Sequence, residues 1–446
     1  MTDWSTVGYA LLPHPNQPLV LAQSGPTAID LPNFAKNDRV WPWDTYLLKP
    51  ILEEKVGSPI NILRYIARHA DQESRRMYSI HLVEPRNDAL PSDATWQPVE
   101  AILEHTAMPA MLQEGLKQWQ IEQKSGVIPE RRAPWALPDW HAQVENWIAD
   151  QVSSLGRGRV RDIQPVKSWS ISCVLKVFTD DGLLYFKMAR DLPLFANEGP
   201  VLTCLAGLYP GRVPLPIAFQ PEQGWMLLDD FGTVPDDDFP LREQARLMQD
   251  FARLQIDSSQ ELGVLLAVGC KDRRLDALLS QIEPLLDDEL ILGSLTPEER
   301  DRLQQAAPRL RELLIELTSL SIPYALLHGD LHAGNVIPRE GTFLYFDWTD
   351  AAVSHPLFDM IHIFREEEEA QKNTLQEAYL GAWEAHYSAA DVRRAWELAG
   401  VLYGLYHAVS YQYIAHGIEE LVLSELNFAY YFLRKLLAGL QQLDPG

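Results

Sequence analysis

Cysteine is scarce in this sequence, which has 446 residues and three cysteines, Cys173, Cys204 and Cys270. The three lie far apart and form no Cys-x-x-Cys pair. We therefore expect neither a disulfide framework nor a zinc site built on cysteine. A protein that lives in a reducing compartment is the expectation that follows.

Long apolar runs are missing as well. No stretch has the roughly 20 uninterrupted apolar residues that a membrane-spanning helix needs. The first residues, MTDWSTVGYALLPHPNQ, carry an early acid and no basic group ahead of an apolar run, which is not the pattern of a secretory signal. The sequence therefore predicts a cytoplasmic protein without a membrane partner.

Positively charged residues are also few: the sequence has 38 lysines and arginines but 62 aspartates and glutamates. The net charge is −24, and such a surface repels the phosphates of nucleic acids and anionic lipids. We expect no nucleic-acid partner. Composition leaves the oligomeric state open.

The chain is too long for one simple core, and its patterns divide it into four regions. Residues 1–125 combine strand and helix patterns, with a predicted hairpin around HPNQ, and predict a smaller α+β domain. Residues 126–140 contain proline and arginine without a period, which predicts a linker. Residues 141–230 begin with a helix and continue as strands, and residues 231–446 are almost entirely helical in pattern.

Local signals fix some element boundaries. Asp180–Gly182 predicts the turn of a β-hairpin. Thr296 with Glu299 three residues later predicts a capped helix start. Two prolines fall inside helical patterns: we expect the first helix to be interrupted or to start near Pro50, and Pro308 to kink or split its helix.

The stretch ALLHGDLHAGNVIP, residues 325–338, places polar groups between two apolar segments. Asp330 precedes Asn335 by five residues, and the predicted strand GTFLYFDW returns Asp347 twelve residues after Asn335. Two oxygen ligands for a hard cation and one carboxylate for a substrate are what phosphoryl transfer needs. Isolated turn residues are the structural alternative.

The motif HGDLHAGN followed by FDW resembles the aminoglycoside phosphotransferase and choline kinase family, which is related to the eukaryotic protein kinases. The resemblance covers about residues 160–435. It implies an α+β, bilobal protein-kinase-like fold, with a small mixed β lobe in residues 141–230 and a large helical lobe in 231–446. It also implies ATP- and Mg²⁺-dependent transfer of the γ-phosphate to a hydroxyl of a small molecule.

Residue roles follow from the resemblance by position. Asp330 becomes the catalytic carboxylate that orients or deprotonates the acceptor hydroxyl, while Asn335 and Asp347 hold the metal. His328 braces the catalytic loop, and Asp359 of HPLFDM supports that loop from behind. For His332, loop packing and substrate contact both stay open.

The nucleotide end of the site also follows from the resemblance. Lys187 in GLLYFKMA is expected to contact the α- and β-phosphates, with Glu198 holding it in place. Lys176 on the preceding strand is the rival lysine. The remaining nucleotide contacts are a phosphate-covering loop with Ser170 and Ser172, and backbone groups near Leu228 and Asp230 for adenine.

The acceptor is not named by the sequence, so aminoglycoside-, choline- and sugar-type hydroxyls all remain open. Tyrosines and a histidine recur at helical spacing near the C-terminus, either as core or as a cradle for an ammonium group. They are Tyr403, Tyr406, His407, Tyr411 and Tyr413.

Residues 1–125 faintly resemble the Nudix hydrolase fold through the opening hairpin, the helix LLKPILEEKVGS and the strand MYSIHLVEP. Glu53, Glu54 and Gly57 are present, but Pro50 and Ile51 stand where an arginine and a glutamate are expected, so the domain would be degenerate. An unrelated α+β cap is the alternative. Two other functions stay open: a catalytically idle nucleotide-binding module, and nucleoside-diphosphate hydrolysis by this domain.

Overall fold

The computed structural model describes residues 4–24, 29–86, 95–235, 239–423 and 428–443. Among the described helices, none combines the length and apolar character needed to cross a membrane. The chain forms two compact units, the first comprising residues 1–189 and 418–422 and the second residues 190–417 and 423–446.

The first unit begins with a four-stranded sheet in the order β4-β1-β6-β5. Strand β1 runs parallel to β6 and antiparallel to β4, and β5 is antiparallel to β6. The strands of this sheet and the elements near it in the sequence are β1 (Ser5–Leu11), β2 (Val20–Ser24), β3 (Ile29–Asp30), β4 (Asn33–Lys36), α1 (Thr45–Val56), β5 (Ile60–Asp71), β6 (Arg76–Pro85), β7 (Thr95–Gln97), α2 (Val99–His105) and α3 (Ala110–Ser125).

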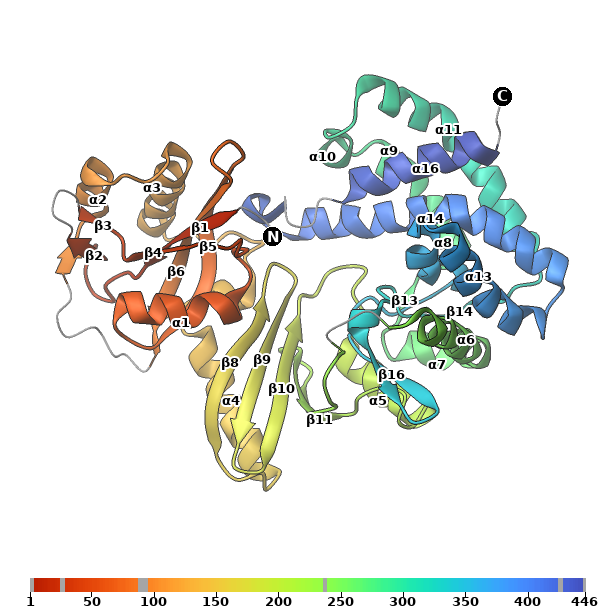
Figure 1. Ribbon diagram of the computed structural model, residues 1–446, viewed down its shortest axis with the longest axis horizontal. Coiled ribbons are helices and arrows are strands. Elements are labelled where there is room, and N and C mark those ends of the chain that lie inside the picture. Colours follow the sequence, from red (N-terminus) through yellow and green to blue (C-terminus); the bar gives the residue numbers. More distant parts are fainter. Residues whose placement is uncertain (1–3, 25–28, 87–94, 236–238, 424–427, 444–446) are drawn as a thin grey trace. The chain divides into compact units, whose positions relative to one another are not determined.

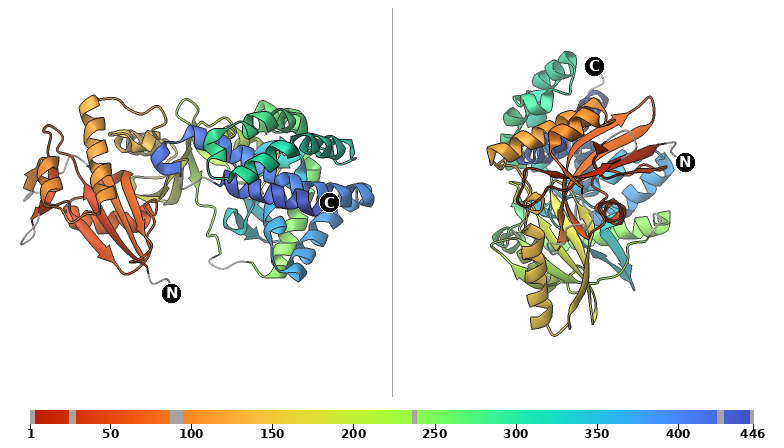
Figure 2. Two further views of the ribbon diagram at one scale, coloured as in Figure 1. Left: turned by 90° about the horizontal axis from the view of Figure 1, so that it is seen from above. Right: turned by 90° about the vertical axis from the view of Figure 1, so that its left-hand side faces the viewer.

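Both faces of this sheet are apolar because each carries a helix. Side chains alternate between faces along a strand, so Leu11 joins the core that contains Leu112 of α3, while Ala10 joins the core that contains Leu48 and Leu52 of α1. Figures 1 and 2 show α1 and α3 on opposite sides of the sheet. This helix–sheet–helix arrangement does not test the Nudix resemblance, which stays a prediction.

The hairpin predicted around HPNQ forms over residues 12–21, where Leu21 N donates to Leu12 O at 2.9 Å. His14 N donates to Leu19 O at 2.9 Å, and Pro13 forms an isolated bridge with Val20. Strand β2 then leaves β1 and pairs with β3 and β7. The turn-forming residues of HPNQ correctly predicted where the chain reverses. They carry no information about which strands β2 pairs with after the turn.

Pro50 lies inside α1 without ending it, since the helix runs to Val56 and closes at Gly57 with φ +76°. After α3, the predicted linker contains the 3₁₀ turn η2 (Pro134–Ala136) and a buried Trp135, whose indole N–H donates to Trp169 O at 2.9 Å. The part of this stretch around Trp135 is therefore packed within the first unit.

The rest of the first unit is a helix and a three-stranded antiparallel meander. They are α4 (Trp140–Ser154), β8 (Val160–Ser168), β9 (Ser172–Thr179) and β10 (Gly182–Ala189). The predicted turn is confirmed, because Thr179 pairs with Gly182 across it. Trp140 and Trp147 of α4 pack edge-on against Phe186 of β10, which fixes the helix on one face of the meander.

The second unit is mostly helical (Figure 1). Its strands form a hairpin of β11 (Pro216–Gln220) and β12 (Trp225–Asp229), a small sheet of β13 (Lys271–Asp272), β14 (Ala325–Leu327) and β17 (Ala352–Ser354), and a hairpin of β15 (Val336–Arg339) and β16 (Thr342–Tyr345). Its helices are α5 (Glu198–Leu208), α6 (Leu241–Ser258), α7 (Leu262–Ala267), α8 (Leu275–Ser280), α9 (Ile282–Leu286), α10 (Glu289–Leu292), α11 (Pro297–Ser319), η3 (Ala333–Asn335), η4 (Pro356–Met360), α12 (Ile361–Arg365), α13 (Glu369–Glu384), α14 (Ala389–Gly417) and α16 (Ala429–Leu443).

Helix α11 begins as predicted. Thr296 Oγ1 accepts from Glu299 N, and Glu299 returns its carboxylate to Thr296 N at 2.9 Å. Pro308 does not split this helix, which is continuous over 23 residues. The α+β class is confirmed, with the larger sheets in residues 1–229 and mostly helix after them.

Candidate active site

The polar stretch forms a loop between β14 and β15, and its shape depends on Gly329. This glycine has φ +84°, where side chains are strained, and a Cβ atom here would lie 2.4 Å from the backbone oxygen of Asp350. The loop then closes in η3, where Asn335 N donates to His332 O at 2.9 Å. Glycine therefore lets the loop pass close to the segment that follows Asp347.

Asp359 holds the start of this loop, as the resemblance implies. Its two carboxylate oxygens accept from His328 N at 2.7 Å and Gly329 N at 2.8 Å, and Gln255 Nε2 lies 3.3 Å away. Burial raises the pKa of Asp359 to about 7 despite these two backbone donors. The loop thus rests on a buried carboxyl group whose charge state changes near neutral pH.

Asp330 and Asn335 are in direct contact. Asn335 Nδ2 donates to Asp330 O at 2.9 Å and lies 3.4 Å from Asp330 Oδ2. Partial loss of water around the Asp330 carboxylate acts to raise its pKa, but the hydrogen bond and charge of His332 outweigh this and lower it. The side chain remains 58% exposed, so an ionised carboxylate is open to a substrate.

The two histidines of the loop differ in their surroundings. His328 is fully buried, and its Nε2 lies 2.9 Å from Phe346 O, while burial lowers its pKa. His332 Nδ1 accepts from Gly334 N at 3.0 Å, so its proton resides on Nε2, which points to Asp330 Oδ2 at 3.5 Å. In this arrangement His332 closes the loop and faces Asp330.

Asp347 follows β16 and has φ +64°, a conformation that is uncommon for a residue with a side chain. Phe346 N, just before Asp347, donates to Asn335 O at 3.0 Å. This bond holds the backbone next to Asp347 close to Asn335, the other candidate metal ligand. The Thr349 hydroxyl lies 3.0 Å from Asp347 Oδ1, which orients that carboxylate. The structure therefore brings Asp330, Asn335 and Asp347 into one neighbourhood.

Glu198 reaches this neighbourhood from the start of α5. Its carboxylate accepts from Trp348 N at 3.0 Å and lies 3.1 Å from the Thr349 hydroxyl. Sequence reasoning assigned Glu198 to Lys187 and missed Thr349, because nothing local in FDWTD signals a contact 151 residues away. Lys187 belongs to the first unit and Glu198 to the second, and their pairing stays a prediction.

The oxygen groups fit a magnesium ion. Asn335 uses its amide nitrogen on Asp330 O, which leaves its amide oxygen for a ligand role. Together with an Asp347 carboxylate, this is the small oxygen set that Mg²⁺ takes when phosphates and waters complete its shell. Within the described residues no group of three His, Cys, Asp or Glu side chains is suited to a metal, so a fully protein-made cage is not what this loop offers.

The nucleotide candidates of the first unit lie on β9, β10 and the turn before them. Lys187 is opposite Val174 and only 7% exposed, although a lysine on a strand is usually solvated. Ser170 is buried, and Ser172 Oγ accepts from the Trp169 indole at 2.7 Å, which leaves its own hydroxyl proton for another acceptor. Their contacts with a nucleotide stay predictions.

The adenine candidates belong to the second unit. Leu228 lies near the end of β12 and is buried, and Asp230 follows the strand. The Asp230 carboxylate accepts from Gly232 N at 2.9 Å, which forms a tight turn after the strand. Their proposed backbone contacts to adenine are likewise untested predictions.

The C-terminal aromatic side chains are mainly core. Tyr403, Tyr406 and His407 are all at least 94% buried, and the Arg273 guanidinium already covers the Tyr406 ring at 3.6 Å. The cation that Tyr406 binds is therefore internal. Tyr406 and His407 therefore offer no open cradle for an ammonium group, whereas Tyr403 also lines a cavity.

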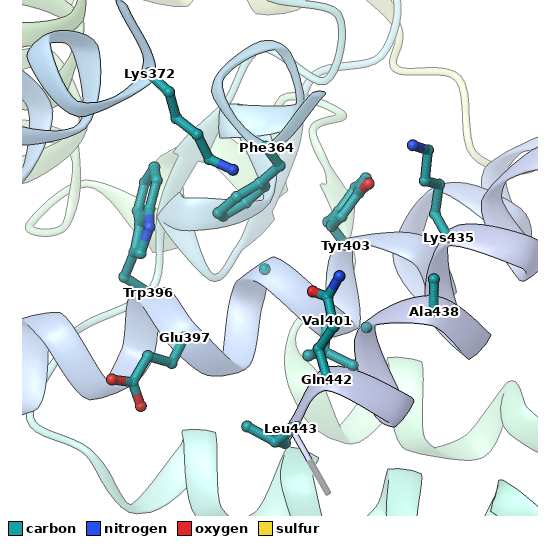
Figure 3. A pocket seen from close by; sticks show the side chains of 12 residues that line it. Phe364, Lys372, Trp396, Glu397, Val401, Tyr403, Lys435, Ala438, Gln442 and Leu443 are labelled. Atoms are coloured by element: carbon teal, nitrogen blue, oxygen red, sulfur yellow. The ribbon is translucent and has the colours of Figure 1, made fainter. Parts of the chain in front are cut away.

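A cavity of about 410 Å³ lies beside this core (Figure 3). Figure 3 shows the Phe364, Trp396 and Tyr403 rings around it, and its charged lining groups are Lys372, Lys435 and Glu397. The His362 ring contacts the His332 ring at 5.8 Å, but residues two apart on a helix point to opposite sides, so Phe364 faces away from the loop. The cavity therefore lies behind α12 as seen from Asp330.

Comparison with known protein families gives one match to part of this chain. Residues 193–396 match the family model described as "Phosphotransferase enzyme family". No curated protein matches.

Among solved structures, similar ones include macrolide 2'-phosphotransferase MphH from Brachybacterium faecium, at 16% identity over 64% of this chain and 97% of that one, with a TM-score of 0.44. Choline kinase LicA from Streptococcus pneumoniae is 14% identical over 66% and 99% of the two chains, with a TM-score of 0.43. The family match, and not these structural likenesses, confirms the resemblance to the phosphotransferase family for residues 193–396, which hold Asp330, Asn335, Asp347 and Asp359.

Proposed function

We propose that this protein is an ATP- and Mg²⁺-dependent phosphotransferase that moves the γ-phosphate to a hydroxyl of a small molecule. The observation that carries the proposal is the contact of Asp330 with Asn335, together with the bond from Phe346 N to Asn335 O that brings Asp347 to the same loop. The family match of residues 193–396 supports the same chemistry.

Asp330 is the group that acts on the acceptor. Its pKa is lowered, so it is ionised at neutral pH and can accept a hydrogen bond from the acceptor hydroxyl. His332 Nε2 and Asn335 Nδ2 hold this carboxylate from two sides, so its orientation is set before the acceptor arrives. Catalysis of this kind depends mainly on positioning and electrostatics.

Asn335 and Asp347 would hold the magnesium ion. A bound Mg²⁺ supplies positive charge that stabilises the phosphates during transfer. Thr349 and Glu198 keep the Asp347 segment in place through the hydroxyl contact and the bond from Trp348 N. Lys187 is proposed to contact the α- and β-phosphates, as the family resemblance implies.

The proposed acceptors are aminoglycoside-, choline- and sugar-type alcohols. A panel of such compounds, incubated with ATP and Mg²⁺ and scored by mass for the gain of one phosphate, tests the proposal. Asp330→Asn should lower turnover on any accepted compound by about 10²–10⁴-fold. Asp287→Asn, at an exposed aspartate, is the matched control and should leave turnover unchanged.

The same experiment separates the alternatives. An idle nucleotide-binding module binds ATP in a titration with Mg²⁺ but modifies nothing in the panel. A nucleoside-diphosphate hydrolase run by residues 1–125 keeps all of its turnover in Asp330→Asn. Either result contradicts the proposed function.

A further inference from the structure

Helix α1 packs against β8 within the first unit (Figure 1). A cavity of about 480 Å³ is lined by residues of both elements. Three basic side chains line it, from three different elements: Lys49 from α1, Arg86 after β6, and Lys176 from β9. The other lining residues are Tyr46, Pro50, Glu53, Asp162, Gln164, Pro165 and Val166. The proposed phosphotransfer site uses none of these side chains.

The two acids of the cavity are occupied by the protein itself. Glu53 Oε1 accepts from Ile60 N at 3.1 Å and so fixes the start of β5. Asp162 accepts from Ile163 N at 2.9 Å, from Gln164 Nε2 at 2.8 Å and from Arg86 at 3.3 Å. These carboxylates therefore act as part of the wall and are poorly placed to neutralise Lys49.

Lys49 is the group that lacks a good partner. It is only 9% exposed, and the nearest carboxylate oxygen, on Glu53, lies 3.9 Å from its ammonium nitrogen, which is too far for a hydrogen bond. The described residues supply no hydrogen bond to this ammonium group. Burial, and then the charge of Arg86, lower the pKa of Lys49. A buried ammonium group in this state is costly unless an acceptor binds it.

Lys176 is the third basic side chain of the cavity, and its place on β9 shows on which face of the meander the cavity opens. On β9 it is opposite Gln164 of β8 and Tyr185 of β10. Residues two apart on a strand share a face, so Lys176, Tyr185 and Lys187 lie on the same face of the meander. The cavity therefore opens on the face that also carries the proposed phosphate-contacting lysine.

We propose that this cavity binds an organic phosphate, with phosphate oxygens on Lys49 and Lys176 and the organic part against Tyr46, Pro50 and Pro165. A phosphate supplies the acceptor oxygens that the Lys49 ammonium group lacks. Two sources share this chemistry, a separate phosphorylated metabolite and the nucleotide itself.

The test uses the full chain with inorganic phosphate as the probe, at constant ionic strength. Phosphate at ten times its dissociation constant should raise the melting temperature of the wild type by about 2–4 °C. Lys49→Met should lower phosphate affinity in calorimetry at least about tenfold, and Lys176→Met should lower it by a smaller factor. Lys55→Met, on the same helix but outside the cavity, is the matched control and should bind phosphate like the wild type.

The Lys49→Met variant also reports on its own folding. Methionine has nearly the same length and carries no charge, so without phosphate this variant should melt at or above the temperature of the wild type. If Lys49→Met melts in that way and still binds phosphate as tightly as the wild type, the proposal is overturned. It is also overturned if the wild type shows no phosphate binding at millimolar concentration.

Competition identifies the source of the phosphate. If ATP displaces inorganic phosphate from the wild type and Lys49→Met weakens ATP binding, the cavity holds a phosphate of the nucleotide. If phosphate and ATP bind together, the cavity serves a separate phosphorylated metabolite. Both results support an organic-phosphate site, and neither depends on finding the acceptor of the phosphotransfer reaction.

Discussion

Thr349 connects two acidic side chains that come from distant parts of the chain. Its hydroxyl lies 3.0 Å from Asp347 and 3.1 Å from Glu198, and all three residues are at least partly buried. Two nearby carboxylates repel each other unless a donor or a cation lies between them. The hydroxyl is such a donor, so its removal should disturb the position of Asp347.

Thr349→Val should therefore raise the KM for Mg²⁺ by about tenfold, because the one hydrogen bond that the hydroxyl donates to these carboxylates is lost. The change keeps the shape of the side chain, so the melting temperature should move little. Initial rates at varied Mg²⁺ and saturating ATP give the measurement. Thr349→Ser restores the hydroxyl and should restore the KM. Equal effects of both substitutions would show that shape, and not the hydroxyl, matters.

Asp359 gives a pH dependence with a definite sign. The pKa of Asp359 is about 7 in the folded protein, whereas the ordinary pKa of an aspartate is 3.8. Between pH 3.8 and pH 7 the folded protein therefore keeps a proton on Asp359 that the unfolded chain has released. Its stabilising contribution is then complete below pH 4 and is lost as the pH rises to 7, at roughly 1.4 kcal/mol per pH unit inside that window.

Asp359→Asn tests this at one position. At pH 5 the variant should be less stable by about 1–3 kcal/mol, because an amide NH₂ faces one of the two backbone N–H donors. The difference between wild type and variant, from urea unfolding followed at the second unit, should shrink from pH 5 to pH 8. A difference that stays constant or grows over that range contradicts the raised pKa.

The loop between β14 and β15 is the element on which the site depends, and Gly329 sets its path. Gly341, in the turn between β15 and β16, has a similar φ of +76°, but a Cβ there meets nothing within 4 Å. Gly341→Ala therefore carries only the conformational strain, about 1–2 kcal/mol. Gly329→Ala adds a clash with the backbone oxygen of Asp350 at 2.4 Å.

Gly329→Ala should thus lower turnover at least about 100-fold by displacing Asp330, whereas Gly341→Ala should lower it less than about threefold. Steady-state rates with both variants make the comparison, and circular dichroism shows whether each is folded. Similar activity in the two variants would mean that the loop adapts, and would remove the role given to Gly329.

Elements with local signals were predicted well from the sequence, and elements set by distant contacts were not. The turn at Asp180–Gly182 and the capping box at Thr296 are local chemistry, and both are confirmed. The parallel pairing of β1 with β6 joins segments about 70 residues apart, and no local residue type encodes it. The same limit hid Thr349, while the spacing of Asp330 and Asn335 was readable because their contact is local.

At the scale of the whole molecule, the chain enters the first unit twice. Residues 418–422 follow α14 of the second unit but belong to the first. Arg132, whose side chain is 6% exposed, donates to Glu419 at 2.7 Å and to both carboxylate oxygens of Glu122 at 2.8 and 3.0 Å. Arg64 contacts the same Glu122 at 2.9 Å. This ion-pair network fixes the returning segment within the first unit.

Arg132→Met should release that segment, because Glu419 loses its arginine while Glu122 keeps Arg64. The expected cost is roughly 1–3 kcal/mol, since the two carboxylates are about three-quarters buried and a buried charge without its partner is unfavourable. Hydrogen exchange by mass spectrometry should show faster exchange at 418–422.

Lys124→Met breaks the exposed pair with Glu100 and is the control, with a loss of stability of less than about 0.5 kcal/mol expected. Glu419→Gln in the Arg132→Met background should then add little, since the network is already broken, and an additive cost would show that the arginine and Glu419 act independently.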